Sequence, residues 1–219
     1  MSDSRYINGT AAPLPTPNLD TDQIMPKQFL RGIDKAGLDK GVLYDMRYDT
    51  NHQLRTDFVL NQAAYKGTSI LVGGSNFGCG SSREHAVWGL QQFGIRAVIA
   101  SSFGEIFYSN AMNNRLMLVM LDEADVLRIM ADASNPASNA IQIDVAHRTV
   151  RSNSVEAQFT LSERHRHMFL EGLDMIGATL ALNEKISAFQ EAHWHHRPWL
   201  KNVAARTKER LNNVAHHSI

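Results

Sequence analysis

Apolar runs and helical periods alternate through the middle of the chain. Residues 69–72 and 95–100 are short runs rich in β-branched and apolar side chains, which predicts two buried strands. Between them, residues 84–93 have a helical period that ends at Gly94. One face of this helix is apolar and contains Ala86, Val87, Leu90 and Phe93. The pattern predicts a strand–helix–strand unit with parallel strands and a right-handed crossover.

The flanking segments extend this unit into a larger α/β domain. Further helices are predicted at 102–113, 123–133 and 162–194, the last with breaks near Gly172 and Gly177. Further strands are predicted at 116–121, 140–146 and 149–151, the last two as a hairpin. Residues 5–17 carry three prolines and are expected to be extended. The fold class that follows is α/β.

Composition and charge argue against several classes of protein. The chain has 219 residues, 43% hydrophobic and 20% charged, as expected of a globular protein with one large or two small domains. Its 22 basic and 22 acidic side chains cancel, so no overall field favours nucleic acid or a membrane surface. The apolar runs are too short for a membrane span, and residues 1–20 lack an apolar signal core. With one cysteine and no internal disulfide, we expect a cytoplasmic protein.

A glycine-rich turn between the first predicted strand and its helix has the features of an anion-binding site. It reads Gly73-Gly74-Ser75-Asn76-Phe77-Gly78-Cys79-Gly80, followed by Ser81-Ser82-Arg83. Glycines let backbone N–H groups approach a ligand, and a helix start adds unpaired amides. Arg83 adds a guanidinium suited to a carboxylate or a phosphate. The spacing fits neither a P-loop, a nucleophile elbow nor a Rossmann fingerprint, since Cys79 replaces the P-loop lysine and the other two motifs lack a glycine.

The adjacent serines allow two interpretations. Ser81 and Glu84 have the spacing of a capping box, in which Ser81 accepts the N–H of Glu84 and the carboxylate reaches back. Alternatively, one hydroxyl caps the helix and the other stays free beside Arg83 as a candidate for proton abstraction. A serine base needs donors already aimed at its oxygen, because its hydroxyl ionises far above neutral pH.

Two acidic residues lie upstream, in Asn18-Leu19-Asp20-Thr21-Asp22. Asp20 and Asp22 can be paired catalytic carboxylates or the start of a metal site. Acids at this spacing without further ligands more often bond to local backbone in turns. We therefore expect Asp20 and Asp22 to support the site, and we expect no metal bound by this chain.

Three motifs in combination resemble the small subunits of 3-isopropylmalate dehydratase, a family of the aconitase superfamily. They span residues 18–26, 78–86 and 100–107, in the order and spacing of that family. The similarity continues through residues 171–177 and fades after about Trp199. It implies a swivelling domain over residues 1–199, like the mobile C-terminal domain of aconitase and with C-terminal helices, and a tail of unknown role over residues 200–219.

The resemblance implies roles for the residues of the glycine-rich turn. Ser81 resembles the serine that removes the proton beside a substrate carboxylate. Ser82 and Arg83 resemble the neighbours that position and neutralise this carboxylate. Gly78 and Gly80 are expected to scaffold the site, together with Asp20, Thr21 and Asp22.

Residues 27–32 match a loop that, in the family, lies near the side group of the substrate. Phe29 and Leu30 can supply apolar surface for an isopropyl group, and Arg31 a polar alternative or an ion-pair partner. The competing interpretation is that the two apolar residues pack the fold and that Arg31 is solvated. Both interpretations stay open.

The resemblance makes this chain half of an enzyme. It implies a large subunit whose three cysteines hold a [4Fe–4S] cluster, with the fourth iron binding the leaving hydroxyl. The single Cys79 agrees with this division, because such a cluster needs several thiolates. Cys79 is expected to fill the turn as a small apolar residue.

The implied reaction isomerises (2S)-2-isopropylmalate to (2R,3S)-3-isopropylmalate through 2-isopropylmaleate, in leucine biosynthesis. One alternative is the same chemistry on another small dicarboxylate, of the methylmalate, citraconate or homoaconitate type. The other is a noncatalytic, anion-binding regulatory module. In each case the expected ligand is a small anion.

The C-terminal part of the sequence has two features without an assigned role. His193, His195 and His196 invite a metal interpretation, but no cysteine or carboxylate cluster accompanies them, which favours solvated or interface histidines. The basic tail from Lys201 to Ile219 can be an amphipathic helix, a docking element or disordered.

Overall fold

The computed structural model describes residues 5–30 and 35–215, with side chains up to residue 212. The chain divides into two compact units, the first ending at Asp174 and the second beginning at Met175. The predicted boundary at 199/200 falls inside the second unit. The family-based domain assignment stays a prediction, and the two units are described separately.

The first unit is built on one mixed seven-stranded sheet with the order β4-β3-β2-β1-β5-β6-β7. Its strands are β1 Tyr6–Leu14, β2 Ile70–Gly73, β3 Ala97–Ala100, β4 Met117–Met120, β5 Ala140–Asp144, β6 Thr149–Arg151 and β7 Glu156–Gln158. Neighbours from β4 to β1 are parallel, and neighbours from β1 to β7 are antiparallel. Strand β1 joins the two halves, pairing with β5 over its first part and with β2 over its last.

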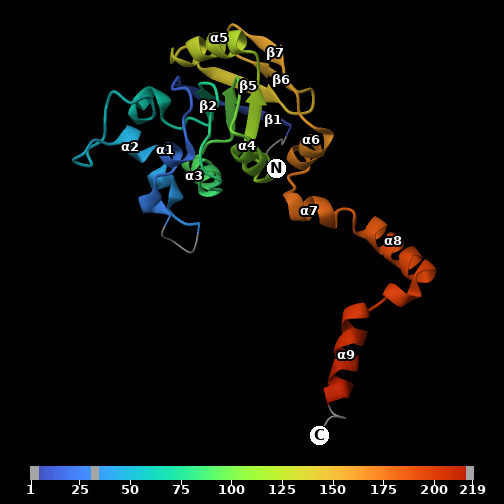
Figure 1. Cartoon of the computed structure of the whole chain (residues 1–219). Helices are drawn as coiled ribbons and strands as arrows, with labels where there is room; N and C mark the ends of the chain where they lie inside the picture. Colours follow the sequence, from blue (N-terminus) through green and yellow to red (C-terminus); the bar gives the residue numbers. More distant parts are fainter. Residues whose placement is uncertain (1–4, 31–34, 216–219) are drawn as a thin grey trace. The chain divides into compact units, whose positions relative to one another are not determined.

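Helices cover both faces of the parallel half of the sheet. The helices of the first unit are α1 Thr21–Ile24, α2 Tyr44–Arg47, α3 His85–Phe93, α4 Glu105–Asn113, α5 Glu123–Ala133 and α6 Glu163–Leu170. Figure 1 shows α5 on one side of the strands and α3 and α4 on the other. Every residue of β2 and β3 is buried, as expected for parallel strands that are covered on both faces. The continuous apolar runs of the sequence therefore mark the middle of the core.

The structure confirms most of the predicted helices and strands and corrects one predicted helix break. Strand β1 lies within the segment 5–17 that is expected to be extended, and it takes the central place in the sheet. Its Pro13 lies where β1 pairs with β2 only, so its missing N–H is tolerated. The helix break predicted near Gly177 is wrong, because Gly177 lies inside the helix Met175–Leu180. A single glycine costs a helix only about 1 kcal/mol, which the neighbouring residues offset. Gly172, in contrast, follows the end of α6 with a φ of +66°.

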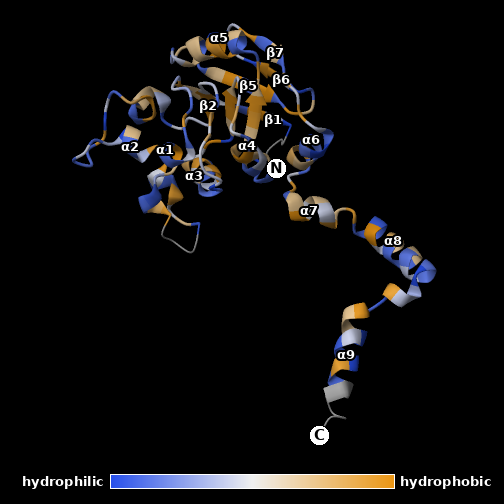
Figure 2. Cartoon of the chain, viewed as in Figure 1, coloured by the Kyte–Doolittle hydropathy of each residue, from blue (hydrophilic) through white to orange (hydrophobic). Residues whose placement is uncertain are grey.

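The second unit is helical throughout its ordered elements. It contains α7 Met175–Leu180, α8 Asn183–His196, a 3-10 turn at Pro198–Leu200 and α9 Val203–Ala215. None of its described side chains is buried, and the hydropathy colours of Figure 2 show hydrophobic residues along these helices. Of the open interpretations for the tail, the helical one is confirmed over α9. No cluster of three or more potential metal ligands occurs among the described residues, which include His193, His195 and His196.

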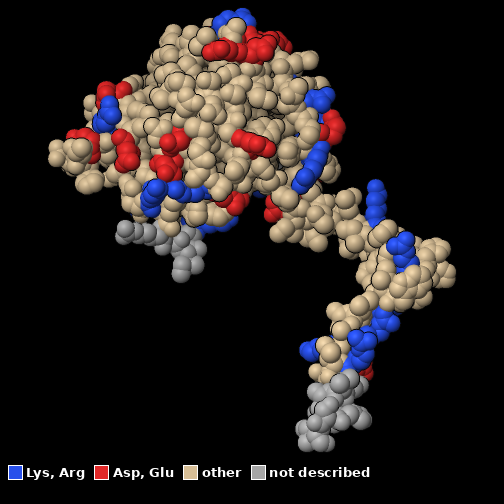
Figure 3. All heavy atoms as spheres, in the orientation of Figure 1, with Lys and Arg blue, Asp and Glu red and all other residues tan. Residues whose placement is uncertain are grey.

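The distribution of charge and of apolar residues in the structure agrees with the balanced charge and the short apolar runs of the sequence. On the face of the first unit drawn in Figure 3, acidic and basic side chains are intermixed. Within the described part of the chain, no helix combines the length and the apolar character that crossing a membrane requires.

Candidate active site

Three loops meet at the carboxyl edge of the parallel strands. The loop after β2 pairs with the segment after β1 through Asp20 and Cys79, and with the segment after β3 through Phe77 and Phe103. The Gly78 N–H donates to the Leu19 carbonyl at 2.7 Å. The glycine-rich turn therefore lies at the sheet edge at which ligands bind in open α/β folds.

Two glycines give this loop its path. Gly78 has a φ of +75°, and a Cβ there would lie 2.3 Å from Cγ of the buried Phe107. Gly80 has a φ of +94°, with the nearest contact of a Cβ at 3.3 Å, from Asp20. Gly78 is thus needed for close packing on α4, whereas Gly80 is needed mainly for its backbone conformation.

The short helix α1 faces the loop and is fixed by a capping box. The Asp20 carboxylate accepts the Gln23 N–H at 2.7 Å, and the Gln23 side chain accepts the Asp20 N–H at 3.0 Å. The Thr21 N–H donates to the Cys79 carbonyl at 2.9 Å. Asp20 therefore serves the backbone of α1, in agreement with a supporting role.

Ser81 is held by the side chain of Thr21. The Ser81 N–H donates to Thr21 Oγ1 at 3.1 Å, and the two hydroxyl oxygens lie 3.0 Å apart. Thr21 is 1% exposed, while Ser81 is half-buried. The hydroxyl of Ser81 is thus positioned by a buried partner that lies far away in the sequence.

Arg83 is held by the next residue of α1. Its Nη1 forms an ion pair with Oδ1 of Asp22, and Lys27 Nζ lies 3.6 Å from Oδ2 of the same carboxylate. The Arg83 side chain is 25% exposed. One carboxylate therefore orients two cations beside the loop that carries Ser81.

The capping-box interpretation of Ser81 and Glu84 is wrong. Helix α3 begins at His85, Glu84 is its N-cap residue, and no side chain caps this end. The alternative in which one serine hydroxyl caps the helix is therefore wrong in this respect too. The Glu84 carboxylate accepts instead from Asn114 at 2.5 Å, and the Ser82 carbonyl accepts from Asn110 at 3.4 Å. Contacts with α4 and the residue after it, rather than a local cap, position the start of α3.

Phe29 and Leu30 are half-buried and pack against the hydrophobic core. The ring of Phe29 lies 4.9 Å from that of Tyr44. These contacts favour the packing interpretation without testing a role in substrate selection, which stays a prediction for both residues. Arg31 lies outside the described residues.

Cys79 is half-buried in the glycine-rich turn. Its Sγ donates to the Asn18 carbonyl at 3.3 Å. This contact joins the loop after β2 to the segment after β1, as expected of a residue that fills the turn.

The sequence patterns indicated no role for Lys27, Asn110 or Asn114. Asn110 and Asn114 are four residues apart, so they fall on one side of α4 and its C-cap, and this spacing is a usable signal for side chains that face one neighbour. Lys27 follows Asp22 by five residues across a turn, and no local pattern indicated that pairing.

Comparison with known proteins identifies the family. The family model of the aconitase C-terminal domain matches residues 3–124, and the model of the C-terminal domain of 3-isopropylmalate dehydratase small subunits matches residues 175–203. The chain is 68% identical to 3-isopropylmalate dehydratase small subunit 1 of Chromobacterium violaceum, covering 94% of this chain and 97% of that one. It is 43% identical to small subunit 2 of Salmonella typhimurium, covering 94% and 99%.

A solved structure supports the same assignment. The crystal structure of 3-isopropylmalate dehydratase from Methanocaldococcus jannaschii matches with a TM-score of 0.62 and 26% identity, covering 84% of this chain and 99% of that one. The predicted aconitase-type α/β fold is thereby confirmed. The chain belongs to the family of 3-isopropylmalate dehydratase small subunits, which carry the aconitase C-terminal domain.

Proposed function

We propose that this chain is the small subunit of a two-subunit hydro-lyase that isomerises (2S)-2-isopropylmalate to (2R,3S)-3-isopropylmalate through 2-isopropylmaleate in leucine biosynthesis. The observation that supports it most directly is that α1 holds both Ser81, through Thr21, and Arg83, through Asp22. A proton acceptor and a carboxylate-binding cation are therefore oriented by one short helix. A chain with a single cysteine and no internal disulfide suits the reducing environment of the cytoplasm, where we place this enzyme.

Ser81 acts on the proton of the carbon beside a substrate carboxylate. Its alkoxide takes this proton in the dehydration half of the reaction, and its hydroxyl returns a proton in the hydration half. The bond electrons stay on the carbon, where the adjacent carboxylate delocalises them. The Thr21 hydroxyl, fixed 3.0 Å from Ser81 Oγ before the reaction begins, is a donor that can stabilise the charge of the alkoxide.

Arg83 binds the carboxylate of the substrate. A guanidinium has five N–H donors, and the ion pair with Asp22 uses one of its nitrogens, so the fork can hold a second carboxylate. Negative charge grows on the substrate carboxylate as the proton leaves, which makes this contact stronger in the transition state. Ser82, exposed next to Arg83, adds a hydroxyl donor to the same carboxylate.

The partner is the large subunit that the family name implies. This chain has one cysteine, whose Sγ donates to a backbone carbonyl, and that does not fit the ligand set of an iron–sulfur cluster. We therefore assign a [4Fe–4S] cluster to the large subunit. When bound there, it supplies a Lewis-acidic iron for the leaving hydroxyl.

The test is turnover of the reconstituted complex. The chain is assembled anaerobically with a large subunit, and hydration of 2-isopropylmaleate is followed by ultraviolet absorbance. Replacing Ser81 by Ala should lower kcat by about 10²- to 10⁴-fold, the usual contribution of a positioned acid–base group.

The matched control is Ser109→Ala, which removes an exposed hydroxyl from α4 and should leave kcat unchanged. Full turnover by the Ser81 variant would refute the assignment of Ser81. If the unsubstituted complex hydrates another small unsaturated dicarboxylate but not 2-isopropylmaleate, the chemistry stands and the substrate is wrong.

A further inference from the structure

The side-chain oxygen of Thr21 makes three polar contacts with Ser81. Its Oγ1 accepts the Ser81 N–H at 3.1 Å, lies 3.1 Å from the Ser81 carbonyl oxygen as a donor, and lies 3.0 Å from the Ser81 hydroxyl oxygen. All three contacts involve one oxygen of Thr21 and one residue of the loop. The hydroxyl of Thr21 therefore has a choice of partners.

A count of hydrogens shows what this choice is. A hydroxyl has one hydrogen and two lone pairs, and the Ser81 N–H occupies one lone pair of Thr21. In one arrangement the Thr21 hydrogen points to the Ser81 carbonyl, and Ser81 donates its own hydrogen to Thr21. In the other arrangement Thr21 turns its hydrogen toward Ser81 Oγ. Only the second arrangement stabilises a negative Ser81 oxygen.

We propose that Thr21 is a positioning residue that follows the protonation state of Ser81 by switching its hydroxyl between these two acceptors. This rests on the proposed role of Ser81 as the base. When Ser81 is a neutral hydroxyl, Thr21 donates to the Ser81 carbonyl. When Ser81 is an alkoxide, Thr21 donates to Ser81 Oγ.

No covalent bond of Thr21 is made or broken in this cycle. The substrate C–H bond breaks, its proton forms the new O–H bond of Ser81, and its electron pair stays with the substrate. The hydrogen of Thr21 remains on its own oxygen and rotates about the Cβ–Oγ1 bond. The switch thus needs no co-reactant.

The surroundings of Thr21 suit such a switch. Thr21 is 1% exposed, so water does not compete for its hydroxyl group. Water also does not take the place of this hydroxyl when a substitution removes it. The capping box of Asp20 and Gln23 and the bond from the Thr21 N–H to Cys79 hold the backbone of α1 against the loop. Only the hydroxyl hydrogen is left to move, which makes the donor preorganised.

The experiment compares Thr21→Val and Thr21→Ser in the reconstituted complex. Valine keeps the shape but loses the hydroxyl, both as donor to Ser81 Oγ and as acceptor of the Ser81 N–H. We therefore expect kcat to fall by at least about 10²-fold, the usual cost of one preorganised donor. KM should change little, because Thr21 acts through Ser81 rather than on the substrate. Serine restores the hydroxyl and should recover most of the turnover.

The pH profile separates this role from a structural one. Without the donor, alkoxide formation at Ser81 needs a higher pH, so the ascending limb of kcat should move to higher pH in Thr21→Val. Both variants keep the charged groups of α1, of the turn after it and of the loop, which are Asp20, Asp22, Lys27, Arg83 and Glu84. A general loss of structure would lower kcat at every pH without moving the limb.

The outcomes distinguish this inference from the proposed function. If Ser81→Ala abolishes turnover while Thr21→Val keeps it, or lowers it with an unmoved limb, the switch is refuted and the base stands. If Ser81→Ala keeps full turnover, the base assignment itself fails. Size-exclusion chromatography of each variant with the large subunit shows whether the complex has formed.

Discussion

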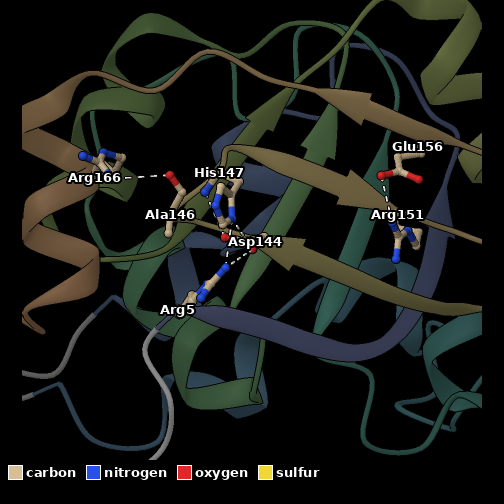
Figure 4. Close-up of polar contacts among 7 residues, drawn as sticks. All are labelled: Arg5, Asp144, Ala146, His147, Arg151, Glu156 and Arg166. Carbon is tan, nitrogen blue, oxygen red and sulfur yellow. Dashed lines mark hydrogen bonds and ion pairs between the residues drawn. The ribbon is translucent and has the colours of Figure 1, made fainter.

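Asp144 connects the start of the chain to the antiparallel half of the sheet. Its carboxylate accepts from the Arg5 side chain at 3.2 Å and from the backbone N–H of His147 at 2.9 Å, and it lies 2.8 Å from His147 Nδ1 (Figure 4). Burial works against ionisation, but the hydrogen bonds from His147 and Arg5 outweigh it and hold the pKa of Asp144 well below its ordinary value. The charged form is therefore bound more tightly in the folded chain.

Replacing Asp144 by Asn should destabilise the chain in a pH-dependent way. A depressed pKa stabilises the fold above the ordinary aspartate value of about 3.9, and this stabilisation is lost as the pH falls below it. At pH 7 the free energy of unfolding should drop by about 1–3 kcal/mol, the range for a buried bond to a charged group. Urea unfolding at pH 7 and below pH 4 measures it, and the gap between the two proteins should narrow at acid pH.

Glu156→Gln is the matched control for Asp144→Asn. Glu156 pairs with Arg151 at 2.8 Å on the surface (Figure 4), where both side chains are mostly exposed. Water screens such a pair, so its loss should leave the urea midpoint unchanged. If the difference in the free energy of unfolding between Asp144→Asn and the unsubstituted chain stays constant with pH, the charge of Asp144 does not stabilise the fold.

Among the loops and elements, the loop after β2 has two glycines, Gly78 and Gly80, whose replacement should affect stability and catalysis to different degrees. Gly78→Ala places a Cβ 2.3 Å from the ring of Phe107 and forces a left-handed backbone on alanine, so we expect a loss of about 2–4 kcal/mol. Gly80→Ala meets nothing closer than 3.3 Å, and the backbone term of about 1–2 kcal/mol remains. Urea midpoints of the two variants test this order.

Under conditions in which both variants are fully folded, we expect Gly80→Ala to lose more turnover than Gly78→Ala. Gly80 sets the path of the chain into Ser81, and a shift of about 1 Å in a reacting group can cost 10²-fold. Gly80→Ala should therefore lose at least tenfold in kcat under conditions in which it is fully folded. Unchanged kcat would show that the φ of +94° at this position is not needed to place Ser81.

The sequence predicted elements with a strong local pattern and missed those that depend on distant contacts. Helix α5 and strands β2 and β3 have clear periods or apolar runs and lie where predicted. The three-residue β7 is too short for a period to be visible. In the site, the glycine-rich turn was recognised from its own residues. The interpretation of Ser81 as a cap failed because its partner, Thr21, is 60 residues away.

In the whole molecule, the buried core and the C-terminal helices belong to different units. Every buried hydrophobic residue of the described chain lies between Ile7 and Phe169, inside the first unit. The second unit contributes most of the exposed large hydrophobic side chains and, among its described residues, none of the core. A segment without buried side chains stabilises a fold little, because burial of apolar surface is the main favourable term.

Removing residues 175–219 should therefore leave the first unit folded with nearly its full stability. For a chain of this size, about 1 kcal/mol corresponds to a shift of 2–4 °C in Tm, so we expect a change below about 2 °C. Calorimetry of the truncated and full chains at equal concentration measures it, with the near-ultraviolet circular dichroism of the core aromatic residues as a check on native packing. A drop in Tm of about 10 °C, several times that shift, would mean that the helices after Asp174 bury apolar surface that the core needs, and that the two units form one cooperative domain.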